Sequence, residues 1–240
     1  MRDLIVKIIQ AGLRPFGAKI ARTYTEREEA FRVIRVASEI GAECILDVGA
    51  NIGQFAHSVI CCGWKGKIVS FEPLEAEFNI LSEKAKAHPN WTIAPRGAIG
   101  EQPGRAEIYR AGNSASSSLL TMRNEHVEAA QESATVGKES IDIRRLDQMD
   151  VIPSASSLFL KIDTQGFEMS VLKGATAIMP QIKGMLVEIS LECLYEGQPQ
   201  GDEIIDYLMR QGFKLHDLIP GFYHPKSGRM LQANIIVIRR

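Results

Sequence analysis

Short apolar runs alternate with amphipathic segments along most of this chain. The apolar runs are bounded by glycine, proline and small polar residues, as buried strands of a parallel sheet should be. The segments between them repeat apolar residues at helical spacing. Strands are therefore expected over residues 43–48, 67–71, 91–94, 157–162, 184–189, 213–218 and 233–238. Helices are expected over residues 26–40, 53–62, 74–87, 168–179 and 202–211. This order predicts a doubly wound α/β sheet.

Two regions depart from the simple alternation. Within residues 104–144, short alternating stretches at 106–109 and 140–143 flank a serine-rich segment, residues 113–118. This pattern predicts a β-hairpin insertion after the third strand, with a mobile tip that either contacts a ligand or is a plain linker. At the other end of the chain, a tight turn at residues 225–228 joins the last two strands. Strands joined in this way run antiparallel, so the sheet is expected to be mostly parallel with an antiparallel ending.

Composition limits the classes of protein that remain. The 240 residues suffice for one large domain, and 28 basic against 29 acidic side chains give a net charge of −1, which does not suggest a nucleic acid partner. The four cysteines form no Cys-x-x-Cys pair, which indicates reduced thiols in a cytoplasmic protein rather than disulfides or a zinc site. Charges interrupt every apolar run well before the length of a membrane span.

The N-terminal segment differs in charge from the rest. Residues 1–22 carry five basic side chains and one acid, and four apolar residues between 4 and 9 could share one helical face. We expect a helical extension over residues 1–24, followed by the main domain at 25–240. This helix would pack on the domain or on a partner subunit in a homodimer. Peripheral contact with a membrane surface is the alternative, and a secretory signal is not favoured.

The first chemical motif is Ile45–Gly53, read together with Glu72. A buried strand runs into Asp47, a glycine turn follows, and a helix begins with its free N–H groups facing the crevice. Glu72 ends the next strand, where a carboxylate can accept hydrogen bonds from a ribose diol. The turn lacks one glycine of the dinucleotide fingerprint, and Asp47 would repel pyrophosphate but suit the ammonium group of a methionine moiety. The motif favours S-adenosylmethionine (SAM); an ordinary strand-to-helix turn is the alternative.

The second motif, Leu158–Glu168, places Asp163 at the end of a central strand. Glu168 follows in the first turn of a helix, and Glu188 ends the next strand. Carboxylates near one crevice could serve base catalysis, bind a metal or recognise substrate hydroxyls. Glu168 could equally cap its helix, and Lys161 is expected to be salt-bridged. His224, in a late loop, could reach the site or simply be solvated.

With these motifs the chain resembles the FkbM-type SAM-dependent methyltransferases. The resemblance covers roughly residues 25–240, and its matching stretches are 47–53, 71–73, 97–100, 114–119, 145–147 and 161–168, with Val187-Glu188 and Asn234 in order. One departure is Asp163-Thr164-Gln165-Gly166, where the family often has valine or glutamate before the glycine. This departure leaves cofactor binding intact and concerns the finer contacts to the substrate. The resemblance implies the class I methyltransferase fold, a Rossmann-like seven-stranded sheet with an antiparallel last strand.

The resemblance also implies roles for individual residues. Asp47, Gly49, Asn51 and Gly53 would line the methionine end of the cofactor, Glu72 would hold the ribose, and Ala98 and Ile99 would border the adenine. Ser118, from the serine segment, is a further cofactor contact. Asp163 would sit beside the reacting methyl group as base or hydroxyl orienter, with Glu188 and His224 as the next candidates.

The implied reaction is SAM-dependent O-methylation of a hydroxyl on a sugar, a glycan or a secondary metabolite, with S-adenosylhomocysteine (SAH) as product. A divalent metal is compatible with the sequence but not implied by it. The sequence does not name the acceptor, whose choice is expected to depend on residues 104–144 and 219–229. Two alternatives remain: a catalytically silent methyltransferase-like scaffold, and an NAD-dependent oxidoreductase.

Overall fold

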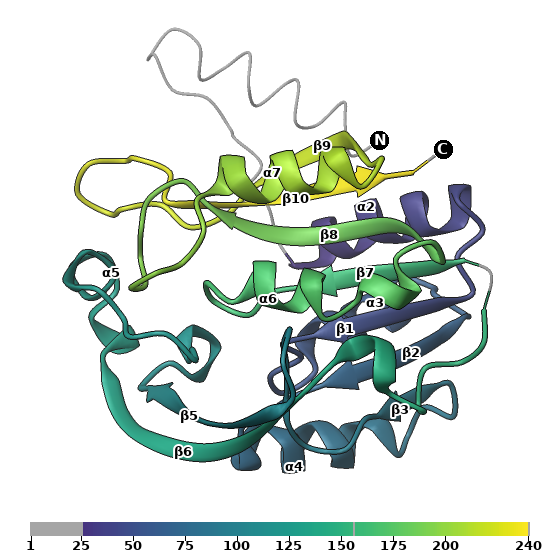
Figure 1. Cartoon of the computed structure of the whole chain (residues 1–240), viewed down its shortest axis with the longest axis horizontal. Coiled ribbons are helices and arrows are strands. Elements are labelled where there is room, and N and C mark those ends of the chain that lie inside the picture. Colours follow the sequence, from purple (N-terminus) through teal and green to yellow (C-terminus); the bar gives the residue numbers. More distant parts are fainter. Residues whose placement is uncertain (1–25, 156, 240) are drawn as a thin grey trace, which may run out of the picture.

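The computed structural model describes residues 26–155 and 157–239 (Figure 1). Its main sheet has seven strands in the order β3-β2-β1-β7-β8-β10-β9. Six of them run in one direction, and only β10 is antiparallel to its two neighbours, β8 and β9. The strands are β1 (Cys44–Val48), β2 (Lys67–Phe71), β3 (Trp91–Ile93), β7 (Leu158–Ile162), β8 (Ile182–Ser190), β9 (Lys214–Pro220) and β10 (Gln232–Ile238). The predicted fold class is confirmed, because this is the strand order and ending expected of the class I methyltransferase fold.

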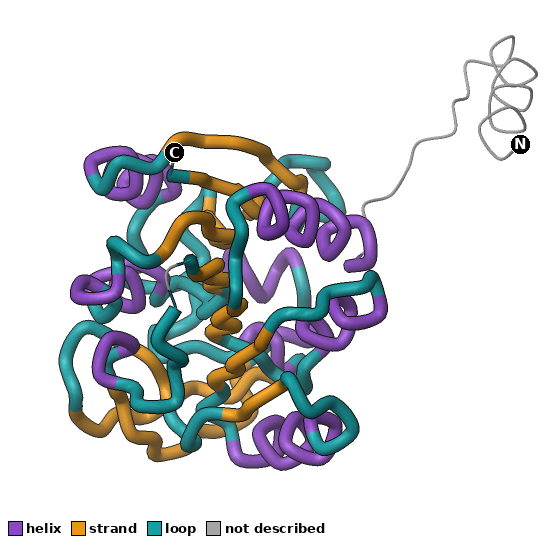
Figure 2. The backbone as a smooth tube through the Cα atoms, turned by 90° about the vertical axis from the view of Figure 1, so that its right-hand side faces the viewer, coloured by secondary structure: helices purple, strands orange, loops and turns teal. Residues whose placement is uncertain are grey.

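Helices cover both faces of this sheet, which Figure 2 shows as a twisted column of strands with helices on either side. One apolar cluster packs β1 and β7 against α6 (Glu168–Lys173) and α7 (Gly201–Arg210). A second cluster lies on the other face, under α2 (Glu26–Glu39), α3 (Gln54–Cys61) and α4 (Glu75–Ala85). Since both faces are covered, β1 and β7 are buried at every position and are apolar almost throughout.

Successive side chains of a strand point to opposite faces of the sheet, and this determines where the charged residues of β1 and β7 lie. Leu46 and Leu160 belong to the cluster under α6, and Ile45 and Phe159 belong to the cluster under α2 and α3. Asp47 and Lys161 follow the second pair by two residues, so they share its face. Since Asp47 is paired with Lys161 in the parallel register, the two charges meet beneath α2 and α3.

The predicted hairpin insertion is confirmed and is longer than expected. Its arms are β5 (Gly104–Ala111) and β6 (Thr135–Arg144), and β4 (Ala98–Ile99) completes a separate sheet in the order β4-β6-β5. Between the arms lies α5 (Asn124–Ala129), a helix that was not predicted from the sequence pattern. The serine segment is packed rather than a loose tip: residues 114–116 form a 3-10 helix, and Ser118 exchanges backbone hydrogen bonds with Tyr109.

The helix predicted over residues 168–179 is shorter in the structure. It ends at Lys173, and a 3-10 turn, Thr176–Ile178, follows. Gly174 follows the helix and passes close to the backbone of Gly100, where a β-carbon would lie 2.2 Å from the Gly100 carbonyl oxygen. The expected N-terminal helix lies outside the described residues. No helix in the described part of the chain is long and apolar enough to span a membrane.

Candidate active site

A pocket of about 290 Å³ opens where β1, β2 and β7 end. This edge of a parallel sheet, outside the carboxyl ends of the strands, is the usual ligand site of such folds. Its walls come from the β1–α3 turn, the residues after β2 and β7, strand β4 and the serine segment. Seven residues expected in the site lie on these walls: Gly49, Asn51, Glu72, Ala98, Ile99, Ser118 and Asp163.

The β1–α3 turn is built from three residues with left-handed backbone. These are Gly49 (φ 76°), Asn51 (φ 48°) and Gly53 (φ 82°). A β-carbon on Gly49 would lie 1.8 Å from the carbonyl oxygen of Asp163, so this glycine lets the ends of β1 and β7 meet. A β-carbon on Gly53 would lie 2.7 Å from the Trp91 ring. Gly53 is therefore needed for packing under the helix and is absent from the pocket wall.

Glu72 holds the turn from the neighbouring strand. Its carboxylate accepts hydrogen bonds from the backbone N–H of Asn51 (2.7 Å) and of Leu74 (2.9 Å), one at each oxygen. Burial raises the pKa of Glu72 to about 7, and those two hydrogen bonds oppose the rise. A carboxylate offers about four acceptor positions, so two remain for ligand hydroxyls.

Asp47 does not reach the pocket wall, although the sequence suggested that it would line the methionine end. It is fully buried. Its Oδ2 accepts a hydrogen bond from Ser70 Oγ (3.1 Å), and its Oδ1 forms an ion pair with Lys161 Nζ at 3.2 Å without hydrogen-bonding geometry. Lys161 also donates to the carbonyl of Gly49 (2.8 Å). Burial acts to lower the pKa of Lys161, but the charges of Asp47 and Asp163 outweigh burial and raise it.

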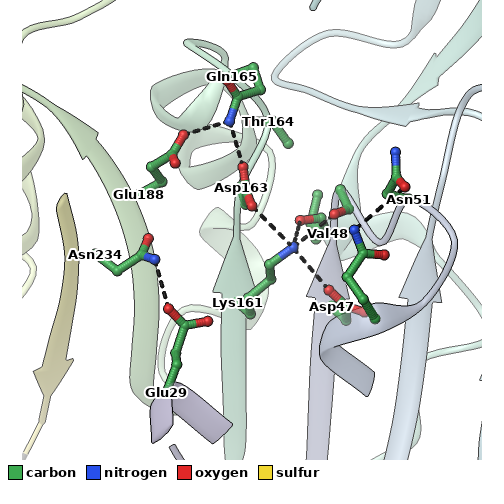
Figure 3. Close-up of polar contacts among 12 residues, drawn as sticks. Glu29, Asp47, Val48, Asn51, Lys161, Asp163, Thr164, Gln165, Glu188 and Asn234 are labelled. Atoms are coloured by element: carbon green, nitrogen blue, oxygen red, sulfur yellow. Dashed lines mark hydrogen bonds and ion pairs between the residues drawn. The ribbon is translucent and has the colours of Figure 1, made fainter. Parts of the chain in front are cut away.

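Asp163 occupies the first position after β7 and differs from Asp47 in its surroundings. Its side chain is 40% exposed and lines the pocket. Oδ1 accepts a hydrogen bond from Gln165 Nε2 (2.9 Å), and Oδ2 lies 3.8 Å from Lys161 Nζ (Figure 3). Asp163 is thus the strand-end acid that a bound acceptor could touch.

Glu168 is buried and Glu188 is half-buried behind Asp163, and neither is on the pocket wall. Glu188 accepts hydrogen bonds from Gln165 (2.7 Å) and Gln232 (2.8 Å), and burial, followed by repulsion from Asp163, raises its pKa well above the usual range. Glu168 accepts from the backbone N–H groups of residues 164 and 166, at 3.0 and 3.1 Å. Burial raises the pKa of Glu168 to about 7. Glu168 thus stabilises the turn before α6 and does not cap the N–H groups of the helix itself.

His224 is not brought to this pocket. It lies in the β9–β10 loop, and its Nδ1 accepts hydrogen bonds from the backbone N–H groups of Lys226 (3.2 Å) and Ser227 (3.3 Å). Its ring lines a separate cavity with Arg123 and Glu192. The histidine therefore takes no part in the chemistry derived for the main pocket.

Several polar residues on the pocket wall were not assigned a role from the sequence. Gln54 is one, and its buried Oε1 has no hydrogen-bond partner among the described residues. Asn234 and Glu29 are two more; Asn234 donates to Glu29 at 2.8 Å (Figure 3). Asn234 could have been noticed as a polar residue inside an otherwise apolar strand, whereas Glu29 lies on a helix with ordinary surface charges.

Among the described residues, no group of three or more His, Cys, Asp or Glu side chains is arranged to hold a metal ion.

Comparison with known proteins agrees with this architecture. The model of the methyltransferase FkbM domain matches residues 47–215. A curated relative, the hexuronic acid methyltransferase AglP of Haloferax volcanii, is 29% identical over 159 residues, which is 65% of this chain and 61% of the relative. The alignment thus spans less than two thirds of that relative's length.

Solved structures with a similar fold have lower sequence identity to this chain. The magnesium protoporphyrin IX methyltransferase of Synechocystis with bound SAH aligns over the whole of both chains at 9% identity and a TM-score of 0.49. Fibrillarin of Aeropyrum pernix with natively bound SAM is 14% identical, with a TM-score of 0.46 over 87% of this chain and 76% of that one. At such scores they add nothing to the strand order, on which the fold assignment rests.

Proposed function

Because the chain belongs to the family defined by the methyltransferase FkbM domain, we propose that it is an enzyme that transfers the methyl group of SAM to a hydroxyl oxygen. SAM is the cofactor of this family and fold. The acceptor class we propose is a sugar, a glycan or a secondary metabolite. What supports this most is that one pocket contains Glu72 after β2 and Asp163 after β7, on either side of β1.

The residues around the pocket fit SAM in their chemistry. Two acceptor positions of Glu72 remain for the ribose hydroxyls. Apolar side chains of Phe71, Leu74 and Ile99 offer a slot for a flat base. The unpartnered Oε1 of Gln54 is suited to an ammonium group, as the methionine end of the cofactor requires. Asp47 would act on this end only indirectly, by holding Lys161 beneath the turn.

SAM, when bound, supplies a methyl group already activated by its positive sulfur. The protein must hold the acceptor oxygen in line with that methyl group, which can supply about 7 kcal/mol of the barrier reduction. It must also remove the hydroxyl proton as the new O–C bond forms and the C–S bond breaks. We assign the proton to Asp163, the exposed acid of the site, with Lys161 stabilising its carboxylate.

The relative in Haloferax volcanii acts on a hexuronic acid, and this supports a carbohydrate acceptor here. The hairpin insertion adds a further argument, because it brings Ser114 and Ser117 to the pocket. Short hydroxyl side chains both donate and accept hydrogen bonds, as recognition of a polyol requires. We propose that the acceptor lies between this segment and Asp163.

The first test is calorimetric titration of the full-length protein with SAM, with SAH and with NAD. We expect micromolar binding of SAM and SAH and none of NAD. Incubation with SAM and a panel of hexosides, hexuronides and polyketide alcohols then follows SAH release and the gain of one methylene group by mass spectrometry.

Each outcome has a defined meaning. SAH release with a methylated hydroxyl supports the proposal in full. Binding of SAM without turnover on any member of the panel would favour the scaffold interpretation. Binding of NAD in place of SAM would overturn the proposal.

A further inference from the structure

Gln165 has a backbone conformation that its side chain does not favour. Its φ is +53°, and Gln165 and Asn51 are the two residues other than glycine with positive φ in the described part of the chain. Such strain persists where the surroundings hold a residue in place, and it is concentrated at functional sites. Gln165 is buried and lies in the turn between β7 and α6, two positions after Asp163.

Both N–H groups of the Gln165 side-chain amide donate hydrogen bonds, and its oxygen has a polar neighbour. Nε2 donates to Asp163 Oδ1 at 2.9 Å and to Glu188 Oε2 at 2.7 Å (Figure 3). Oε1 lies 2.9 Å from the Tyr195 hydroxyl, which is also 2.9 Å from the carbonyl oxygen of Ser116. Two carboxylate acceptors on one side require the NH₂ group there, so these neighbours determine the orientation of the amide.

The backbone of Gln165 is tied to the serine segment as well. Its carbonyl oxygen accepts a hydrogen bond from Ser118 Oγ at 2.7 Å, and Ser118 Oγ in turn accepts from the N–H of Leu120. Gln165 therefore joins the serine segment of the insertion, the half-buried Glu188 on β8 and the exposed carboxylate of Asp163. A carboxylate at position 165 could accept but not donate, and would add a third acid to this group.

We propose that Gln165 is a positioning residue, whose amide fixes the carboxylate of Asp163 for the acceptor hydroxyl and links it to the seating of the serine segment. This inference rests on the proposed function for its catalytic meaning. Gln165 holds Oδ1 of Asp163, which leaves Oδ2, on the side of Lys161, to receive the hydroxyl proton. The amide also bridges the carboxylates of Asp163 and Glu188.

The test replaces Gln165 and follows the Asp163–Glu188 pair by ¹³C NMR of carboxyl-labelled full-length protein, with Asp163→Asn used to assign the signals. Two coupled acids titrate in two steps that belong to the pair. Hydrogen bonds to the charged form favour it, so Gln165→Leu is expected to raise the lower step by at least tenfold in proton affinity. Other charged or titratable groups facing the pair are Lys161, Asp47, Glu29, Glu168 and Tyr195.

Gln232→Met is the matched control, because Gln232 donates to Glu188 but not to Asp163. It should leave the lower step unchanged. An equal shift in both variants, or a shift in neither, would overturn the proposal. Should Gln165→Leu fail to fold, the exchange Gln165→Glu with Glu188→Gln keeps one amide and one acid in the network but removes the donor to Asp163. An unshifted lower step in that double variant would also overturn it.

Turnover gives the second readout. Gln165→Leu is expected to lower kcat at least tenfold with the acceptor KM within twofold, whereas loss of packing would affect SAH binding and the melting temperature. A wild-type protein that does not bind SAH would defeat the proposed function. The titration would still report whether Gln165 holds Asp163, so the two failures are distinguishable.

Discussion

The ends of β1 and β7 are similar in sequence, but their aspartates lie in different surroundings. Each strand is short and apolar, and each leads through an aspartate into a tight turn with left-handed residues. Asp47 lies within β1, faces the helices and is fully buried against Lys161. Asp163 lies one position beyond β7, on the pocket wall, and is 40% exposed. A difference of two residues along the strand thus separates a charge buried within the sheet from one that faces the pocket.

The largest effect is expected from removing the exposed acid. Asp163→Ala should lower kcat by about 10²–10⁴-fold, the usual contribution of a general base. SAH affinity should stay within about twofold, because the ribose and base contacts are elsewhere. Steady-state kinetics and calorimetry measure the two quantities. Turnover within a few-fold of wild type would remove Asp163 from the chemistry.

Removing the buried acid, Asp47, should instead lower the stability of the fold. Asp47→Ala leaves the ammonium of Lys161 buried without its main partner, which costs about 3–5 kcal/mol of unfolding free energy. Asp163→Ala, at a half-exposed position, should cost less than about 1 kcal/mol. Urea denaturation compares the two variants. Recovery of stability in Asp47→Ala combined with Lys161→Met would identify the unpaired charge as the cause, and equal losses in both single variants would contradict the contrast.

Glu72 resembles Asp163 in position, because each lies one residue beyond the end of its strand and lines the pocket. Glu72→Ala should weaken SAH binding by about 1–3 kcal/mol, because two ribose hydroxyls lose their acceptor. Glu75→Ala, at an exposed position of α4, is the control and should leave the dissociation constant unchanged. An unchanged constant in Glu72→Ala would remove Glu72 from the site.

The smallest effect is on the pH dependence of binding. The pKa of Glu72 is raised to about 7 in the free protein, and hydroxyl donors favour the ionised form. Binding should therefore release a proton, and SAH affinity should fall as pH decreases through about 7, by at most tenfold per unit. Calorimetry in buffers of different ionisation enthalpy measures the release. Glu72→Gln should remove this pH dependence. If the SAH affinity of the wild-type protein does not change between pH 6 and 8, the prediction is wrong.

The local sequence pattern was sufficient to predict the strands of the main sheet. The apolar runs gave every strand of the main sheet to within a few residues, because a strand buried on both faces must be apolar throughout. The antiparallel ending followed from the short connection between the last strands. The motifs also pointed to the strand ends where the pocket opens, since the carboxyl ends of parallel strands share one edge.

What the sequence could not determine was which acids at that edge face the pocket. Exposure depends on register between strands distant in sequence, which brings Lys161 to Asp47 and Gln165 to Glu188. The position of Glu29 and Asn234 on the pocket wall also follows only from the packing of α2 beside β10. Short-range periodicity determines secondary structure, whereas the environment of a charge depends on neighbours that only the folded chain brings together.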